Sequence, residues 1–257
     1  MPTTLVSPKP GALPLAIVTG ANRGLGRGVA LGLAREGYRV LAVCRSESEA
    51  RKTSDALVSA SPHGEAARVA PVVMDLAGEV GPVTTEPASV LVNNAGVYLD
   101  VWSREAFETS RRVNVLSPLA LFAAATLVVG ARVVNVSSGY GMLNELSPSY
   151  VRDLEAAKTI DDVTSISFRS DDPMKSEYVA PYKVTKGMLN AATRIAARDY
   201  PDLRINAVCP GWCRTSMGGP SAARSVEQGA NSILWAVLEA PPDVTGGFFR
   251  DGRPLDW

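Results

Sequence analysis

The sequence predicts an α/β protein with a doubly wound, mostly parallel sheet of about seven strands and helices on both faces. Short apolar runs rich in β-branched residues alternate with helical patterns through most of the chain, which is typical of a parallel sheet covered by helices. A glycine-rich turn joins the first of these runs to the first helical pattern. The 257 residues suffice for one large α/β domain. We therefore expect a single domain whose ligands bind at the carboxyl ends of the strands.

The first half of the chain alternates regularly between the two kinds of segment. Strands are recognised as apolar runs bounded by polar, Gly or Pro residues, and helices as apolar residues that recur every three or four positions. Gly37 is suited to end the first helix. The expected strands are 15–19, 39–44, 69–74 and 89–92, and the expected helices are 24–36 and 46–60.

The second half continues the pattern with longer helices. Helical stretches cover about 104–129, where Pro118 marks a break or the first turn of a second helix. The remaining expected strands are 132–136, 203–208 and 247–249, and the remaining expected helices are 150–157, 179–200 and 225–239. Residues 1–14 contain four prolines and are expected to form a flexible tail outside the fold, so that the domain comprises residues 15–257.

Charge and composition argue against several classes of protein. Lys+Arg and Asp+Glu balance at 26 each, so no net field favours nucleic acid or a membrane surface. No apolar run approaches the ~20 residues of a membrane span, and the first residues lack the pattern of a secretory signal. The three cysteines are odd in number and do not have metal-ligand spacing. We expect reduced thiols in a cytoplasmic protein.

His63 is the only histidine, and it lies in a turn-like stretch. A Ser-His-Asp hydrolase and a multi-histidine metal centre both need histidines that this chain lacks. We therefore expect chemistry that uses neither a histidine base nor a bound metal.

Tyr182 and Lys186 are the most informative pair of polar residues. They are four positions apart in a predicted helix, so they lie on one face of it. A phenol with a pKa near ~10 exchanges protons poorly at neutral pH, and a neighbouring ammonium would lower that pKa. The pair is therefore a candidate general acid/base. The alternative is an ordinary pair of solvated side chains on a helix surface.

The glycine-rich turn, residues 19–26, is a candidate binding site for a dinucleotide. Its glycines Gly20, Gly24 and Gly26 allow a tight turn and close approach of a pyrophosphate to the helix N-terminus. Their spacing differs from the fingerprint of the two-domain dehydrogenases. A purely structural turn is the alternative, although the position between the first strand and the first helix favours the binding role.

Two arginines suggest which dinucleotide binds. Arg45 follows the second strand, where folds that bind NAD often carry a carboxylate for the ribose, and Arg23 lies within the glycine-rich turn. Guanidinium groups suit a 2′-phosphate, with which they form bidentate contacts. We therefore expect NADP(H) rather than NAD(H), the alternative being that one or both arginines are solvated charges.

Taken together, these motifs resemble the short-chain dehydrogenases/reductases, from about residue 17 to the C-terminus. The resemblance adds several short motifs to the glycine-rich turn and the Tyr-Lys pair, and it implies a Rossmann-type fold. These motifs are Asp75, Asn93-Asn94-Ala95-Gly96, Asn114, Val136-Ser137-Ser138, Pro210-Gly211 and Thr215.

The resemblance implies a role for each matching residue. Ser138, Tyr182, Lys186 and Asn114 would be the catalytic residues, with Ser138 preferred to its neighbour Ser137. Tyr182 would donate a proton while NADPH supplies hydride, and Asn114 would position water that returns a proton through Lys186. Besides Tyr182 and Lys186, the cofactor-binding residues would be Gly20, Asn22, Arg23, Gly24, Leu25, Gly26, Arg45, Asp75, Leu76, Asn93, Ala95, Gly96, Pro210, Gly211 and Thr215.

The chain departs from the family pattern in two places. Tyr182 follows Ser138 by 44 positions, whereas the family spacing is usually far shorter, so residues 143–178 form an insertion. A similar insertion, and runs like 209–215 and 246–252, mark the monomeric carbonyl-reductase branch, which implies a monomer. In addition, the helix that usually precedes Asn93 is expected to be shortened to a loop.

Aromatic and Met residues flank the predicted site on loops and could form an apolar pocket for a ketone or quinone. The candidates are Tyr98, Tyr140, Trp212 and Met217, together with Trp102 and Leu143. The alternative is that several of them pack beneath the insertion. We expect an NADPH-dependent reductase of a ketone, aldehyde or quinone carbonyl. A secondary-alcohol dehydrogenase and, from another class, a non-catalytic NADP-sensing regulator are the alternatives.

Overall fold

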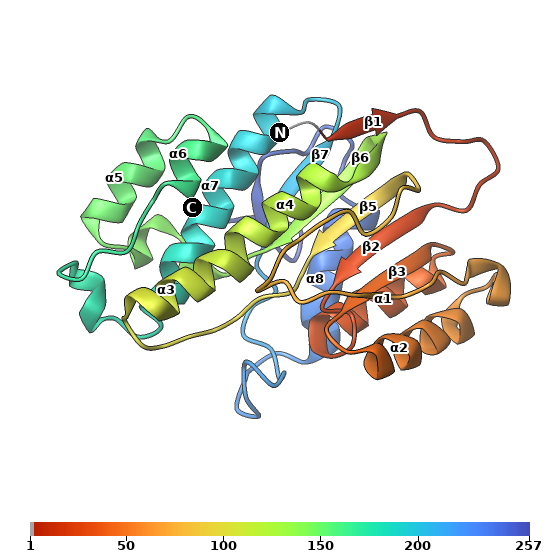
Figure 1. Ribbon diagram of the computed structural model, residues 1–257, viewed down its shortest axis with the longest axis horizontal. Coiled ribbons are helices and arrows are strands. Elements are labelled where there is room, and N and C mark those ends of the chain that lie inside the picture. The colour runs from red at the N-terminus through yellow and green to blue at the C-terminus, as the bar shows by residue number, and fades with distance from the viewer. Residues whose placement is uncertain (1–2) are drawn as a thin grey trace.

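The computed structural model describes residues 3–257 and has a parallel sheet at its centre (Figure 1). The strands of this sheet are β1 (Thr4–Val6), β2 (Leu15–Thr19), β3 (Arg39–Cys44), β4 (Val72–Val73), β5 (Ala88–Asn93), β6 (Thr126–Val136), β7 (Arg204–Val208), β8 (Phe248–Arg250) and β9 (Arg253–Pro254). Their order is β4-β3-β2-β5-β6-β7-β8-β9, with β1 paired to β6. Among the strands of residues 3–257, only β8 and β9 pair in the antiparallel direction. The doubly wound α/β fold predicted from the sequence is confirmed.

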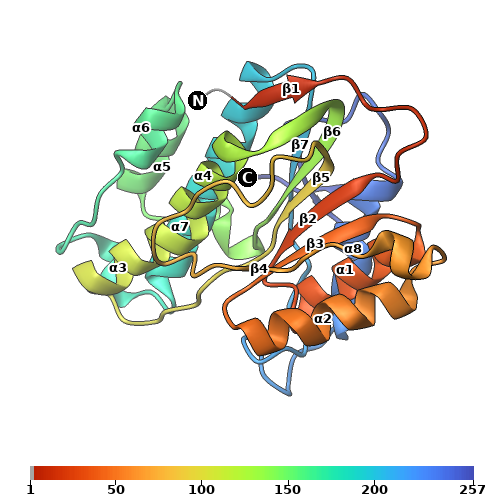
Figure 2. The ribbon, with the colours of Figure 1, turned by 45° about the vertical axis from the view of Figure 1, so that its right-hand side comes forward.

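Helices cover both faces of the sheet (Figures 1 and 2). They are α1 (Gly24–Arg35), α2 (Glu47–Ala60), α3 (Arg104–Arg111), α4 (Ser117–Ala124), α5 (Pro148–Ala156), α6 (Ile160–Thr164), α7 (Ala180–Asp199) and α8 (Val226–Leu238). α1, α2 and α8 lie on one face, and α3, α4 and α7 on the other, with α5 and α6 packed outside α7. The helices are thus divided between the two faces, as in other doubly wound sheets.

Side chains that alternate along each strand build two separate apolar layers. In β2, Ala16 and Val18 belong to the cluster beneath α1 and α8, whereas Leu15 and Ile17 belong to the cluster on the opposite face. Successive side chains of a strand point to opposite faces, so a strand buried on both sides reads as a continuous apolar run. This is why the central strands could be recognised from sequence.

The N-terminal segment differs from the expected flexible tail. Thr4–Val6 pairs in parallel with Thr126–Val128 of β6, and the hydroxyl of Thr3 donates a hydrogen bond to the carbonyl of Phe122. The expectation was wrong for this part because the prolines stand on both sides of a short β-forming run. Met1 and Pro2 lie outside the described residues.

Two further boundaries also differ from the expected ones. β6 begins at Thr126 rather than at residue 132, and helix α4 ends at Ala124 rather than near 129. β6 starts early because Thr126–Val128 pairs with β1. No local sequence pattern indicates this pairing. β4 has only two residues, Val72–Val73, rather than the expected strand 69–74. No helix lies between β4 and β5, as expected.

The insertion, residues 143–178, forms a small helical layer over α7. Its helices α5 and α6 bury Tyr150, Leu154 and Val163 in a cluster with Val184 and Met188 of α7. The helix expected at 150–157 corresponds to α5. The insertion therefore has an apolar core in common with the helix that carries Tyr182 and Lys186.

Candidate active site

The residues that the motifs single out gather where β2, β5, β6 and β7 end. These strands are parallel, so their carboxyl ends meet at one edge of the sheet. α7 runs beside this edge and packs on the turn that follows Ser138. Val179, which precedes α7, has a positive φ of 51°, a conformation that β-branched residues rarely adopt. The chain is thus turned sharply just before Tyr182.

Lys186 is buried beneath this edge without a carboxylate partner. Its side chain is 4% exposed, and its ammonium donates a 2.7 Å hydrogen bond to the carbonyl of Val136, at the end of β6. Burial lowers the pKa of Lys186 to about 8, because a low-dielectric environment disfavours the charged form. The ammonium lies 5.6 Å from the centre of the Tyr182 ring.

Tyr182 lies near both Ser138 and Lys186. Burial raises the pKa of Tyr182 to about 12, and a hydrogen-bonding contact with the Ser138 hydroxyl acts in the opposite direction. The expected lowering of this pKa by Lys186 is therefore wrong for this structure, because desolvation dominates and the lysine bonds a carbonyl instead. The phenol keeps its proton at neutral pH.

The two adjacent serines point in different directions, as alternation along an extended chain requires. The Ser137 hydroxyl contacts the Lys186 carbonyl at 3.4 Å, within the core. The Ser138 hydroxyl instead accepts a hydrogen bond from the backbone N–H of Tyr140 and lies against Tyr182. Of the two, only Ser138 faces the phenol.

Asn114 lies in a π-helical segment, Arg112–Leu116, between α3 and α4. Its side-chain oxygen accepts from the N–H of Val97 at 2.9 Å. Its amide nitrogen donates to the carbonyl of Val97 and to the hydroxyl of Thr185. Asn114 therefore links the loop after β5 to the helix that carries Tyr182 and Lys186.

The glycine-rich turn needs its glycines for steric reasons. Gly20 and Gly24 have φ values of 64° and 53°, which favour glycine. A Cβ on Gly26 would lie 2.3 Å from the carbonyl oxygen of Gly20, so the helix could not pack on the turn. A Cβ on Gly24 would touch Thr215, which brings the Pro210–Thr215 segment beside the turn.

Two residues that lie within the sequence motifs, but to which no role was assigned from sequence, hold this turn against β5. The Thr19 hydroxyl accepts from the backbone N–H groups of Asn94 and Ala95, and the Asn94 amide donates to the Thr19 carbonyl at 2.9 Å. The adjacent Asn93 points the other way and donates to Asn135 inside the sheet. Alternation along β5 could have separated the two asparagines.

The fit of this region to a dinucleotide rests on the N-terminus of α1. The helix has no side-chain cap and no acidic residue in its first turn, so its free N–H groups and positive end suit an anion. Arg23 and Arg45 are exposed, and neither forms an ion pair with any residue of 3–257. The residues present therefore fit a phosphorylated dinucleotide.

The remaining predicted cofactor residues line the same edge or lie near it. Asp75 is exposed and accepts from the N–H of Ala77, whereas Leu76 is buried. Gly96 lies against Asn114 and Lys186. Asn22 and Leu25 belong to the glycine-rich turn and the start of α1, and Pro210 and Gly211 follow β7 after Cys209.

The expected pocket residues divide into two groups. Tyr98 packs edge-on against Tyr182, with 5.0 Å between ring centres, and Tyr140, Trp212 and Met217 are exposed large side chains. By contrast, Trp102 and Leu143 pack against the cluster beneath the insertion. Trp102 and Leu143 therefore pack beneath the insertion, which was the alternative to a place in the pocket.

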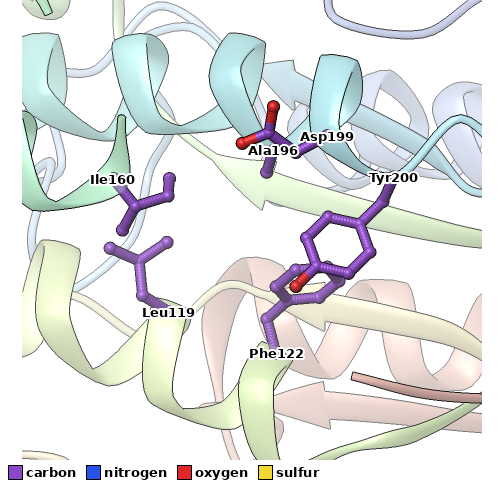
Figure 3. A pocket seen from close by; sticks show the side chains of 6 residues that line it. All are labelled: Leu119, Phe122, Ile160, Ala196, Asp199 and Tyr200. Atoms are coloured by element: carbon purple, nitrogen blue, oxygen red, sulfur yellow. The ribbon is translucent and has the colours of Figure 1, made fainter. Parts of the chain in front are cut away.

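A separate cavity of about 270 Å³ lies away from these residues. It is lined by Leu119 and Phe122 of α4, Ile160 of α6 and the end of α7, where Tyr200 stands beside Phe122 (Figure 3). None of the predicted catalytic side chains lines it. In the described residues 3–257, no group of three or more His, Cys, Asp or Glu could hold a metal ion. No helix in that range is long and apolar enough to cross a bilayer.

Comparison with known proteins agrees with this architecture. A (+)-neomenthol dehydrogenase from Arabidopsis thaliana is 28% identical, over 91% of this chain and 95% of the relative. Carbonyl reductase (NADPH) 1 from Rattus norvegicus is also 28% identical, over 95% and 98% of the two chains. The structure of salutaridine reductase from Papaver somniferum shares the fold, with a TM-score of 0.77 at 23% identity over 93% and 99% of the chains.

The family comparison covers both the glycine-rich turn and the Ser138 region. The model of the short chain dehydrogenase family matches residues 14–151, more than half of the chain. This match, the fold and the gathering of the motifs at one sheet edge lead to the same conclusion: the chain is a member of the short-chain dehydrogenase family of oxidoreductases.

Proposed function

We propose that this protein reduces a ketone, aldehyde or quinone carbonyl to an alcohol, with NADPH as hydride donor and Tyr182 as proton donor. The observation that carries the proposal is that Tyr182 and Lys186 share one face of α7, with the Lys186 ammonium 5.6 Å from the centre of the Tyr182 ring, and that the Ser138 hydroxyl is near enough to lower the pKa of Tyr182. Relatives named carbonyl reductase (NADPH) 1 and neomenthol dehydrogenase support the reaction class.

The proposed roles follow from the contacts of each side chain. Ser138 would donate a hydrogen bond to the substrate oxygen and stabilise the negative charge that develops there. Tyr182 keeps its proton at neutral pH because burial raises its pKa to about 12, so it can donate to an alkoxide, which is far more basic. When bound, NADPH would supply the hydride.

Lys186 and Asn114 would support the proton transfer. Lys186 has a pKa lowered by burial to about 8, so it can both hold and release a proton near neutral pH. Asn114 fixes the loop at Val97 and, in this mechanism, would position water that returns a proton through Lys186.

NADP(H) is the proposed cofactor because Arg23 and Arg45 stand exposed beside the turn, without ion-pair partners among residues 3–257. A guanidinium can bind a 2′-phosphate in a bidentate manner. We expect a lower KM for NADPH than for NADH, and we expect Arg45→Gln to raise the KM for NADPH alone. A clear preference of the wild-type protein for NADH would overturn this assignment.

Replacement of Tyr182 tests the proposed reaction. Tyr182→Phe should abolish the carbonyl-dependent loss of NADPH absorbance and leave NADPH binding nearly intact. Tyr200→Phe, at the far end of the same helix, is a matched control that should keep wild-type turnover. Near-normal turnover of Tyr182→Phe would exclude this proton donor. If the wild-type protein oxidises alcohols with NADP⁺ but reduces no carbonyl, the alternative dehydrogenase direction is the correct one.

We also propose that the protein is a cytoplasmic monomer. Residues 180–193 of α7 are all buried within one chain, partly by the insertion, so this part of the helix has no free face for the helix-to-helix contact common among oligomeric members of the family. The three cysteines are free and buried, which suits a reducing compartment. Light scattering that gives a tetramer mass, or fractionation outside the cytoplasm, would contradict these two proposals.

A further inference from the structure

The last strands of the chain form a hairpin whose tip reaches the proposed active site. β8 extends the sheet beside β7, and the N–H of Cys209 donates to the carbonyl of Phe249 at 2.8 Å. This register places Arg250 beside Cys209, at the carboxyl end of β7. The chain then turns back through Asp251 and Gly252, which both have positive φ.

Arg250 and Gly139 hold one sulfur atom from two sides. The thiol of Cys209 accepts a 2.9 Å contact from the Arg250 guanidinium and a 3.1 Å contact from the N–H of Gly139. A Cβ on Gly139 would lie 3.0 Å from the guanidinium, so the arginine is packed directly against the residue that follows Ser138. Arg250 forms no ion pair with any residue of 3–257, and its Nε is buried without a partner.

The position of Gly139 fixes the Ser138 side chain. Ser138 starts a 3-10 turn, Gly139–Gly141, in which its hydroxyl accepts from the N–H of Tyr140 and its carbonyl from the N–H of Gly141. The outer side of the turn is bonded to Cys209 through the N–H of Gly139. A shift of the sulfur would therefore move the Ser138 hydroxyl relative to Tyr182.

Asp251, the next residue of the hairpin, holds the other side of the site. Its carboxylate forms a bidentate ion pair with Arg224, at 2.6 and 2.8 Å, and Arg224 holds the pKa of this carboxyl below its usual range. The stem of Arg224 packs on Gly211, where a Cβ would come within 2.4 Å of Arg224 Cδ. The Arg224 N–H also donates to the carbonyl of Trp212.

We propose that the tip of the C-terminal hairpin positions the two sides of the active site separately. Arg250 positions Ser138 through Cys209 and Gly139, and Asp251 positions the cofactor-side segment Gly211–Thr215 through Arg224. This proposal rests on the proposed function. Arg250 and Asp251 are positioning residues in it, because each acts through another side chain and neither takes part in the reaction.

The two parts of this proposal, the Arg250 arm that acts on Ser138 and the Asp251 arm that acts on Gly211–Thr215, predict different kinetic effects. In Arg250→Met, the Ser138 turn loses its outer support, so kcat should fall by about 10- to 100-fold, the range expected for a small misplacement of a reacting group, while the KM for NADPH stays unchanged. Arg250→Lys keeps a donor to the sulfur and should recover most of the lost kcat.

Asp251→Asn keeps a residue that tolerates positive φ but loses the ion pair. The KM and the directly titrated Kd for NADPH should rise about 5- to 10-fold, which is the worth of one charged contact, with kcat nearly unchanged. Arg253→Met, an exposed change two residues further along the hairpin, should leave every parameter at its wild-type value.

The experiment is steady-state kinetics of the full chain and these four variants, together with NADPH titration by fluorescence and thermal melting of each. The proposal stands if Arg250→Met changes kcat and Asp251→Asn changes NADPH affinity. It is wrong if both variants keep wild-type kinetics, or if both lose kcat and affinity together in proportion to a lowered melting temperature. A wild-type protein that binds NADPH but reduces no carbonyl would instead refute the proposed function, and the NADPH titrations would still test the Asp251 arm.

Discussion

Lys183 and Lys186 stand one turn apart on α7 and are buried to nearly the same extent, 7% and 4% exposed, yet their surroundings are opposite. Lys183 faces the insertion, where Glu145 and Glu177 each lie 3.0 Å from its ammonium. Lys186 faces the sheet and has only the carbonyl of Val136 as a partner. Burial acts to lower the pKa of both lysines, but the two carboxylates outweigh it at Lys183, whose pKa is raised.

This contrast shows how one helix serves two purposes. A buried lysine with carboxylate partners keeps its charge and ties elements together. A buried lysine without one has a pKa displaced toward neutrality, which suits proton transfer. The insertion supplies the carboxylates on one side and leaves the other side free of them, so Lys183 serves as an anchor and Lys186 is available for chemistry.

The largest expected effect separates the two lysines by activity. Lys186→Met should lower kcat for carbonyl reduction by about 10²- to 10⁴-fold, the usual worth of a group in acid–base catalysis. Lys183→Met, the matched change one turn away, should keep kcat within about threefold, because its ammonium pairs with Glu145 and Glu177 and meets the active-site turn only at the Tyr140 ring, 5.4 Å away. Equal losses of kcat in the two variants would contradict the division of roles.

A second test sharpens the contrast through the pH dependence of stability. Because the folded pKa of Lys186 is about 8 against 10.5 for an ordinary lysine, the unfolded chain binds more protons than the folded chain in this window. The contribution of Lys186 to stability therefore rises as pH increases from about 8 to 10.5. In Lys186→Met, the free energy of unfolding should lose about 2 to 3 kcal/mol of this rise relative to wild type.

Lys183 should behave differently over the same pH range. Its folded pKa is raised, so its contribution to stability is complete below the unfolded pKa and is lost only at more alkaline pH. In urea titrations, the difference in unfolding free energy between Lys183→Met and wild type should stay constant from about pH 8 to about pH 10. This range lies below the pKa of an ordinary lysine. A slope in this variant like that of Lys186→Met would show that the two lysines are not distinct.

The smallest expected effect concerns the carboxylates themselves. Glu145→Gln with Glu177→Gln should lower stability by about 1 to 2 kcal/mol, a modest loss because both glutamates are partly exposed and their charges are screened. Adding Lys183→Met should restore part of this loss, since no unpaired ammonium then remains buried. If the triple variant is less stable than the double variant, packing of the lysine stem, rather than its charge, is the larger contribution.

Much of the fold could be predicted because its signals are local. Apolar runs buried on both sides identified the central strands, and Gly24 and Gly26 identified the turn that opens α1. The strand Thr4–Val6 was missed since the strand with which it pairs lies more than a hundred residues away, in β6. The early start of β6 was missed for the same reason.

The proposed site shows the same limit. Spacing alone placed Tyr182 and Lys186 on one helix face, and the motifs led to Ser138 and Asn114. Alternation separates Asn93 from Asn94, but it could not show which of the two bonds the glycine-rich turn, because that depends on how β5 is oriented within the sheet.

The sequence by itself determined the layered α/β architecture, the glycine-rich turn and the set of side chains available for chemistry. These depend on residue type and on periodicity along the chain. Only the tertiary structure decided which of the two lysines lies beside carboxylates and which lies beside a backbone carbonyl. It also decided that Arg250 lies against the turn after Ser138. Desolvation and the choice of partner depend on segments that are distant in sequence and meet only in the folded chain.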